Sequence, residues 1–161
     1  MVRASLRLLL LLASVSVAGC GPTVDLKKGL QVTILDSGWF DAGIVNGQNK
    51  LVPSFTFTLK NVSDRKLVTI QVNALFRRVS ENEEWGSGFK TVVGSEGLPP
   101  GSMTPPITVR SQLGYTGSED RQEMLQNSHF VDAKVELFGK YAATQWVLLD
   151  TYPIKRQLLL K

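Results

Sequence analysis

Apolar and polar residues alternate along much of the chain after residue 29, which is the period of a β-strand with one buried face. Phe55, Phe57 and Leu59 alternate with threonines and a lysine, and the longest such run extends from Val68 to Phe76. The alternation predicts strands over residues 30–34, 55–60, 68–76, 89–93, 107–110, 131–138 and 145–149. Six to eight short strands at hairpin spacing favour an antiparallel sandwich or barrel.

Two segments interrupt this pattern. Residues 94–106 contain three Gly and four Pro, which excludes a helix or a central strand because Pro lacks the ladder donor. Residues 118–127 predict the one short helix, with Ser118 as its N-cap and with Met124 and Leu125 as a small apolar patch. We expect both segments to be insertions on a rigid β-domain, where partner surfaces are commonly found.

The first 19 residues differ from the rest of the chain. Arg3 and Arg7 precede an apolar stretch with five consecutive leucines, which is the plan of a secretory signal. The stretch is well short of the roughly 20 residues that span a bilayer, so a permanent transmembrane helix is disfavoured.

The end of this leader, Val17-Ala18-Gly19-Cys20, resembles the lipobox of bacterial lipoproteins. The resemblance implies cleavage between Gly19 and Cys20, lipidation of Cys20 and anchoring in the cell envelope. By the sorting rule of enteric bacteria, Gly21 in place of Asp favours the periplasmic face of the outer membrane. The alternative is an ordinary secretory signal cleaved near Ala18, which would leave Cys20 as an unexplained thiol.

After cleavage, residues 20–29 are expected to form a tether and residues 30–160 one domain. If Cys20 carries lipid, no thiol remains for a disulfide, a metal site or a nucleophile, because it is the one cysteine in the chain.

The run from Phe55 to Ser63, followed by a long alternating strand, resembles small immunoglobulin-like envelope domains of the FxLYD and late-embryogenesis type-2 kinds. In those domains an aromatic strand ends at an Asn-x-Ser/Thr turn, which Asn61-Val62-Ser63 matches. The resemblance implies an immunoglobulin-like β-sandwich, into which the helix predicted over residues 118–127 would be inserted. It implies no catalytic residue.

The charge balance and the placement of the histidine and acidic residues limit the classes of function. Loss of Arg3 and Arg7 leaves 16 Lys and Arg against 14 Asp and Glu, which is too balanced for a nucleic-acid-binding surface. The one histidine, His129, is expected on the surface, and Asp132 would lie on the opposite face of a strand. Glu81, Glu83 and Glu84 fall in a predicted hairpin turn and lack the spacing of a calcium loop.

Gly86-Ser87-Gly88 is too short for a phosphate loop or a nucleophile elbow. The sequence therefore predicts no catalytic residue, no metal site and no cofactor. An enzyme would need an acid pair assembled across strands.

Binding residues are easier to nominate. Trp39, Trp85 and Tyr115 lie near predicted strand ends, where aromatic rings can stack on sugars or anchor a protein partner. Large aromatics also close the ends of sandwiches, which we favour for the two tryptophans, with Tyr115 the most exposed of the three. Trp146 is expected in the core.

These observations predict a membrane-anchored envelope lipoprotein that acts as a non-enzymatic interaction or assembly module for an envelope protein. The alternative is a carbohydrate- or peptidoglycan-binding module that uses the loop aromatics.

Overall fold

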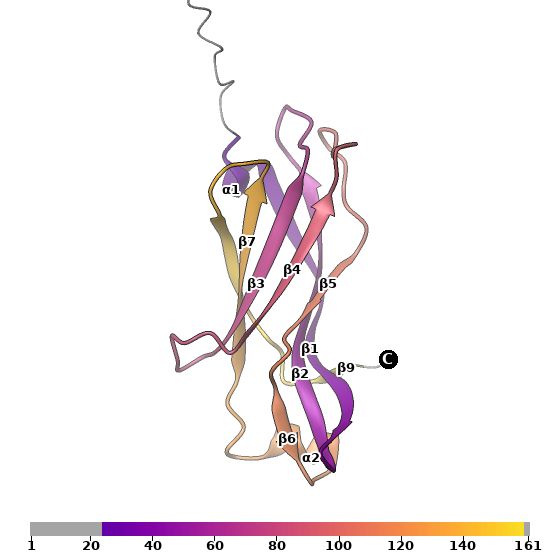
Figure 1. Cartoon of the computed structure of the whole chain (residues 1–161), viewed down its shortest axis with the longest axis vertical. Helices are drawn as coiled ribbons and strands as arrows, with labels where there is room; N and C mark the ends of the chain where they lie inside the picture. The colour runs from indigo at the N-terminus through magenta and orange to yellow at the C-terminus, as the bar shows by residue number, and fades with distance from the viewer. Residues whose placement is uncertain (1–23, 160–161) are drawn as a thin grey trace, which may run out of the picture.

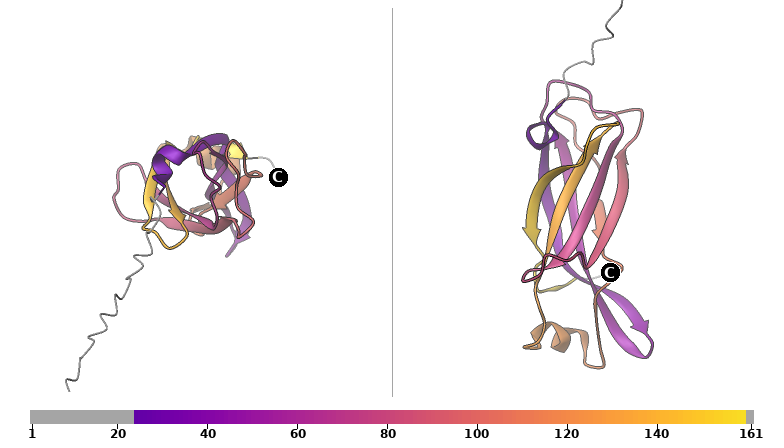
Figure 2. Two further views of the ribbon diagram at one scale, coloured as in Figure 1. Left: turned by 90° about the horizontal axis from the view of Figure 1, so that it is seen from above. Right: turned by 60° about the vertical axis from the view of Figure 1, so that its left-hand side comes forward.

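A computed structural model describes residues 24–159 as a β-sandwich of two sheets. Figure 1 shows an elongated molecule with its strands running along the long axis, and Figure 2 shows the strands of the two sheets arranged around that axis. The elements of the described chain are α1 (Leu26–Gly29), β1 (Leu30–Val45), β2 (Gln48–Asn61), β3 (Ile70–Arg78), β4 (Gly86–Val93), β5 (Ile107–Arg110), β6 (Tyr115–Gly117), α2 (Arg121–Gln126), β7 (Ala133–Tyr141), β8 (Val147–Pro153) and β9 (Leu158–Leu159). The predicted mainly-β sandwich is confirmed. Neither described helix is long and apolar enough to cross a membrane.

The hydrogen-bonded order of the strands defines the two sheets. One sheet has the order β5-β2-β1-β9, with β6 also paired to β2, and the other has the order β4-β3-β7-β8. All pairs are antiparallel except β1 with β9, which run parallel. The long β1–β2 hairpin therefore forms the backbone of the first sheet, and β3 and β7 form the centre of the second.

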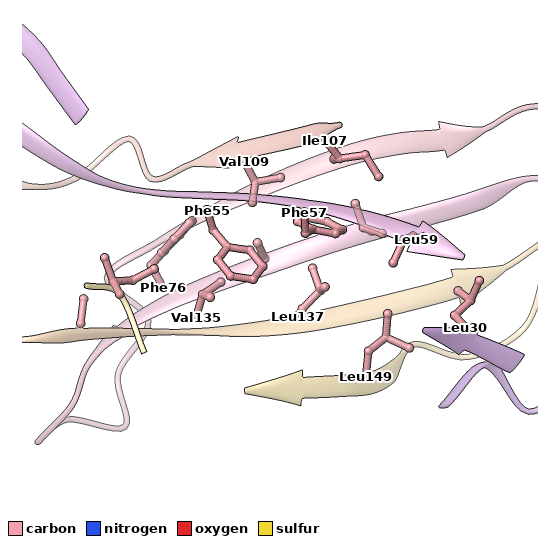
Figure 3. Close-up of a cluster of buried hydrophobic side chains, with 14 of the residues drawn as sticks. Leu30, Phe55, Phe57, Leu59, Phe76, Ile107, Val109, Val135, Leu137 and Leu149 are labelled. Atoms are coloured by element: carbon pink, nitrogen blue, oxygen red, sulfur yellow. The ribbon is translucent and has the colours of Figure 1, made fainter. Parts of the chain in front are cut away.

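Alternation places the core where the sequence predicts it. Phe55, Phe57 and Leu59 from β2 face the second sheet with no exposed surface, and Phe55 stacks on Phe57 with ring centroids 5.3 Å apart (Figure 3). The inward side chains of β3 and β7 are equally buried: Ile70, Val72, Ala74, Phe76, Ala133, Val135 and Leu137.

Several predicted boundaries are wrong. The strand predicted over residues 30–34 continues to Val45, with register shifts after Ile34 and Asp41. Asn46 and Gly47, which connect β1 to β2, have φ of +52° and +77°. Positive φ at both residues is typical of a tight hairpin turn. β6 and β9 were missed because two or three residues are too few to show a period.

The helix is shorter than predicted, and the structure holds a second one. Asp120, not Ser118, caps α2, and its side chain accepts from the backbone N–H of Gln122 at 2.9 Å. Met124 and Leu125 are buried as predicted. The predicted tether over residues 20–29 is also corrected, because Leu26 is only 2% exposed and α1 packs on the sandwich. The tether's first residues lie outside the described chain.

Trp146 is a further correction. It lies in the loop before β8 and is 40% exposed, with its ring 6.1 Å from that of Phe89 and the Lys140 ammonium 5.8 Å from its centroid. The apolar residues around it predict a core strand, but β8 begins one residue later.

The Asn61 side chain organises the turn that follows β2. The Asn61 carboxamide oxygen accepts from the backbone N–H and the hydroxyl of Ser63, at 3.0 and 2.7 Å. Its amide donates to the carbonyls of Arg65 and Leu98, at 2.7 and 2.8 Å. Asn61 is fully buried, so one side chain ties the β2–β3 loop to the loop of residues 94–106.

The glycines of Gly86-Ser87-Gly88 have a packing role. A Cβ on Gly88 would lie 3.2 Å from the Val109 side chain and 3.3 Å from the Arg110 carbonyl oxygen, and one on Gly86 would meet the Ser111 hydroxyl. The absence of these side chains lets β4 approach β5 and close one side of the sandwich.

Candidate functional site

The candidate site lies at the end of the sandwich opposite α1. Figure 1 places α1 at one end of the long axis and the β1–β2 turn, β6 and α2 at the other. We call these the α1 end and the distal end. The distal end forms because β1 and β2 extend beyond the core, and β6 pairs with β2 there through Asn49 to Gly117 and Leu51 to Tyr115.

The three aromatic residues nominated from the sequence contact one another at the distal end. The Trp39 ring centroid is 5.9 Å from that of Trp85 and 5.6 Å from that of Tyr115, and Trp85 and Tyr115 are 5.1 Å apart. Phe130, which the sequence reasoning missed, completes the cluster at 4.6 Å from Trp39 and 4.4 Å from Tyr115. Four segments distant in sequence therefore meet in one aromatic cluster.

Burial assigns different roles to these rings. Trp39 has no exposed surface, so it closes the end of the sandwich and cannot stack on a ligand. Trp85 and Tyr115 are both half-buried, so Tyr115 is less open than the sequence predicts. Its hydroxyl donates to the Val131 carbonyl at 3.0 Å and accepts from the Val131 N–H at 2.9 Å, which fixes the ring.

Two arginines cover the cluster. The Arg78 guanidinium lies 5.0 Å from the Trp85 centroid and 5.8 Å from that of Tyr115. The Arg156 guanidinium lies 5.0 Å from the Phe130 centroid and pairs with Asp132 at 2.9 Å. Cation–π contacts of this kind are worth about 0.5–2 kcal/mol, so both arginines stabilise the packing of the distal end.

A cavity of about 210 Å³ opens beside the aromatic cluster. Its walls combine apolar and polar side chains: Tyr115, Thr116, Glu119, Met124, Asn127, His129 and Phe130. Drug-sized ligands occupy about 300–1,000 Å³, so this cavity fits one side chain or one ring of a larger partner. The aromatic rings give it apolar contact area, and the carboxylate, carboxamide and imidazole provide hydrogen-bonding groups.

His129 is exposed on the rim of this cavity, as the sequence predicts for a surface histidine. Its backbone N–H donates to the Asn127 carboxamide oxygen at 2.9 Å, and its Nδ1 lies 3.3 Å from the same oxygen. Glu81, Glu83 and Glu84 are exposed in the turn between β3 and β4, and Glu81 pairs with Arg78 at 3.1 Å. Within residues 24–159, no three His, Cys, Asp or Glu side chains gather as a metal site would require.

The two segments nominated together as a partner surface lie at opposite ends. Residues 94–106 pack beside the α1 end, where Leu98 pairs with Leu67 and Met103 bridges to Lys60. α2 lies at the distal end, beside the cavity. They cannot form one surface, and the loop is also held by buried Thr104, whose N–H donates to the Leu59 carbonyl at 2.9 Å. Gly19 and Cys20, the nominated cleavage and lipidation residues, lie outside the described residues.

Comparison with known proteins adds little. No family model matches the chain, and no curated protein is similar to it. Among solved structures it is similar to the X-ray structure of Northeast Structural Genomics Consortium target SoR45, with 13% sequence identity and a TM-score of 0.42. The match covers 81% of this chain and 85% of that one. A likeness this distant supports no argument about function.

Proposed function

We propose that the protein is an envelope lipoprotein, anchored through lipid on Cys20, whose distal end binds a partner without catalysing a reaction. The observation that carries the proposal is the opposite placement of chain entry and cavity. Val24, the first described residue, is two residues before α1. β6 and α2, which carry part of the cavity lining, lie at the other end of the long axis from α1 (Figure 1).

The anchor geometry follows from the distance between Cys20 and the folded domain. Val24 is four positions after Cys20, and an extended chain spans at most roughly 3.3–3.6 Å per position, or about 14 Å in all. A lipid on Cys20 would therefore hold the α1 end close to the bilayer. The distal end would then face away from it, with the cavity open to envelope components.

The shape and chemistry of the cavity support binding of a protein partner. It is smaller than the pockets that enclose drug-sized ligands, and its aromatic wall is rigid because Tyr115 and Arg156 are held by hydrogen bonds. A fixed apolar pocket with a polar rim suits a single anchoring side chain from a partner surface. Ile44, in the neighbouring β1–β2 hairpin, is 70% exposed and extends the apolar area of this end.

Photo-crosslinking in the native cell tests this proposal. A photoreactive residue is placed at His129 on the cavity rim, at Ile44 in the hairpin, and at Glu96 in the α1-end loop as a matched exposed control. We expect one reproducible envelope protein to be captured from His129 or Ile44 and not from Glu96. Capture from Glu96 alone would contradict the proposal, and glycan adducts in place of a protein would favour the carbohydrate-binding alternative.

A further inference from the structure

The two ends of the molecule differ in charge. The α1 end comprises residues 24–29, 60–69, 94–106 and 140–146, which together contain six Lys and Arg against three Asp and Glu. The distal end comprises residues 40–50, 77–86, 111–133 and 154–157, which contain six Lys and Arg against eight Asp and Glu. The α1 end therefore carries a net charge of +3 and the distal end a net charge of −2, because the acidic residues and not the basic ones differ in number.

The basic residues of the α1 end are accessible. Lys27 and Lys28 lie on α1, and the Lys28 side chain is 88% exposed. Arg65 and Lys66 are exposed in the β2–β3 loop beside it. Lys28 and Arg65 both border a shallow depression of about 260 Å³ next to Val24.

Large apolar side chains are exposed among these charges. Val62 is 49% exposed, and its backbone N–H donates to the Gly29 carbonyl at 2.9 Å, which places it against α1. Met103 is 54% exposed in the neighbouring loop, which is joined to β2 by the bond from Asn61 N–H to the Ser102 carbonyl. Trp146, 40% exposed, lies in the third loop of this end. Mixed basic and apolar side chains of this kind suit the interface of a bilayer.

We propose that the α1 end docks directly on an anionic bilayer, as a second membrane contact beside the lipid on Cys20. The position of the bilayer beside the α1 end rests on the proposed function. The choice of an anionic bilayer rests on the charge and the exposed side chains of the α1 end. The distal end also exposes apolar residues, among them Ile44 and Val79, but its excess of acid disfavours an anionic surface. Docking holds the long axis upright and presents the cavity to the envelope.

Vesicle binding by the chain that begins at Gly21 tests the docking without the lipid. This part of the protein retains the whole core, because every residue of the buried cluster lies between Leu26 and Ile154. We expect co-sedimentation with phosphatidylglycerol vesicles, little with phosphatidylcholine vesicles, and release as salt shortens the Debye length. Equal binding to both vesicles, or none to either, would overturn the proposal.

Substitutions locate the contact. Lys27→Gln and Lys28→Gln are each expected to weaken binding about fivefold, since one basic residue near an anionic surface contributes about 1 kcal/mol. Val62→Asp should abolish binding, and Ile44→Asp, at the distal end and more exposed, is the matched control that should leave it unchanged. If Ile44→Asp abolished vesicle binding and Val62→Asp did not, the membrane contact would lie at the distal end, and the proposal would be overturned.

Tryptophan emission gives a second readout that does not depend on charge. Trp39 is buried and Trp85 half-buried at the distal end, so vesicles should shift the emission of Trp146 alone, and Trp146→Phe should remove the shift. Mass spectrometry of Cys20 in the native cell separates the two proposals. Lipid on Cys20 without vesicle binding by the domain refutes docking alone, and vesicle binding with an unmodified Cys20 refutes the lipid anchor alone.

Discussion

Replacing Asn61 by alanine should destabilise the protein far more than its polar character suggests. Asn61 is fully buried, and its side chain makes four hydrogen bonds that join the two loops of the α1 end. At a net of about 1 kcal/mol for each bond, Asn61→Ala should lower the free energy of unfolding by about 4 kcal/mol. Ser63→Ala is the matched control, because it removes one short bond, from the hydroxyl to the Asn61 oxygen, and two longer exposed bonds with the Arg65 backbone, for an expected loss of about 1–2 kcal/mol.

Urea denaturation measures this difference. For an m-value of about 2 kcal/mol/M, Asn61→Ala should lower the midpoint by about 2 M and Ser63→Ala by less than about 1 M, with m unchanged. A midpoint shift for Asn61→Ala no larger than that for Ser63→Ala would contradict the assigned role of the Asn61 side chain. It would mean that water replaces the lost bonds and that the turn does not organise the α1 end.

Three further changes probe the distal end and the core. Gly114→Ala would put a Cβ 1.9 Å from a backbone carbonyl oxygen of β2, so we expect thermal unfolding to show a loss of about 1–3 kcal/mol in the free energy of unfolding. Gly94→Ala should cost less, because its Cβ would meet only a flexible glutamate side chain. Tyr115→Phe should cost about 1–3 kcal/mol, because a backbone N–H and carbonyl both lose their partner, and an unchanged melting temperature would contradict the assigned bonds. Burial, assisted by Asp150, raises the pKa of Tyr152 above its ordinary value of 10.0. The folded state therefore keeps this proton to higher pH than the unfolded state does. The free energy of unfolding should fall as pH rises from about 10 through the raised pKa, and the urea midpoint of Tyr152→Phe should decline less steeply over that range.

The strands that the sequence predicted best are those whose burial follows one face. Buried and partly exposed residues alternate cleanly along β3 and β7, and residues 107–110 were predicted with the bounds that the structure has. The second half of β1 was missed because bulges after Ile34 and Asp41 break the two-residue period. Asn46-Gly47 was the available signal for its hairpin, because this dipeptide adopts positive φ at low cost.

The candidate site was predicted in its residue types but not in its arrangement. Trp39, Trp85 and Tyr115 were singled out separately. The register of β1, β2 and β6 in one sheet and of β3 and β4 in the other brings them together. Phe130 gave no signal of its own, because it follows α2 in an irregular loop. Trp146 shows the reverse error, since an aromatic residue beside apolar neighbours predicts burial whether or not its strand has begun.

Spin labels at the two ends of the domain measure its orientation on a bilayer. Cys20 is the one cysteine in the chain and would be acylated, so a spin label on Val62→Cys or Ile44→Cys would be unique in the mature protein. In phosphatidylglycerol vesicles, the account predicts that the label at residue 62 lies at headgroup depth and meets lipid-soluble oxygen, while the label at residue 44 meets only the water-soluble relaxant. Equal aqueous exposure of the two labels, or a deeper position for residue 44, would contradict it.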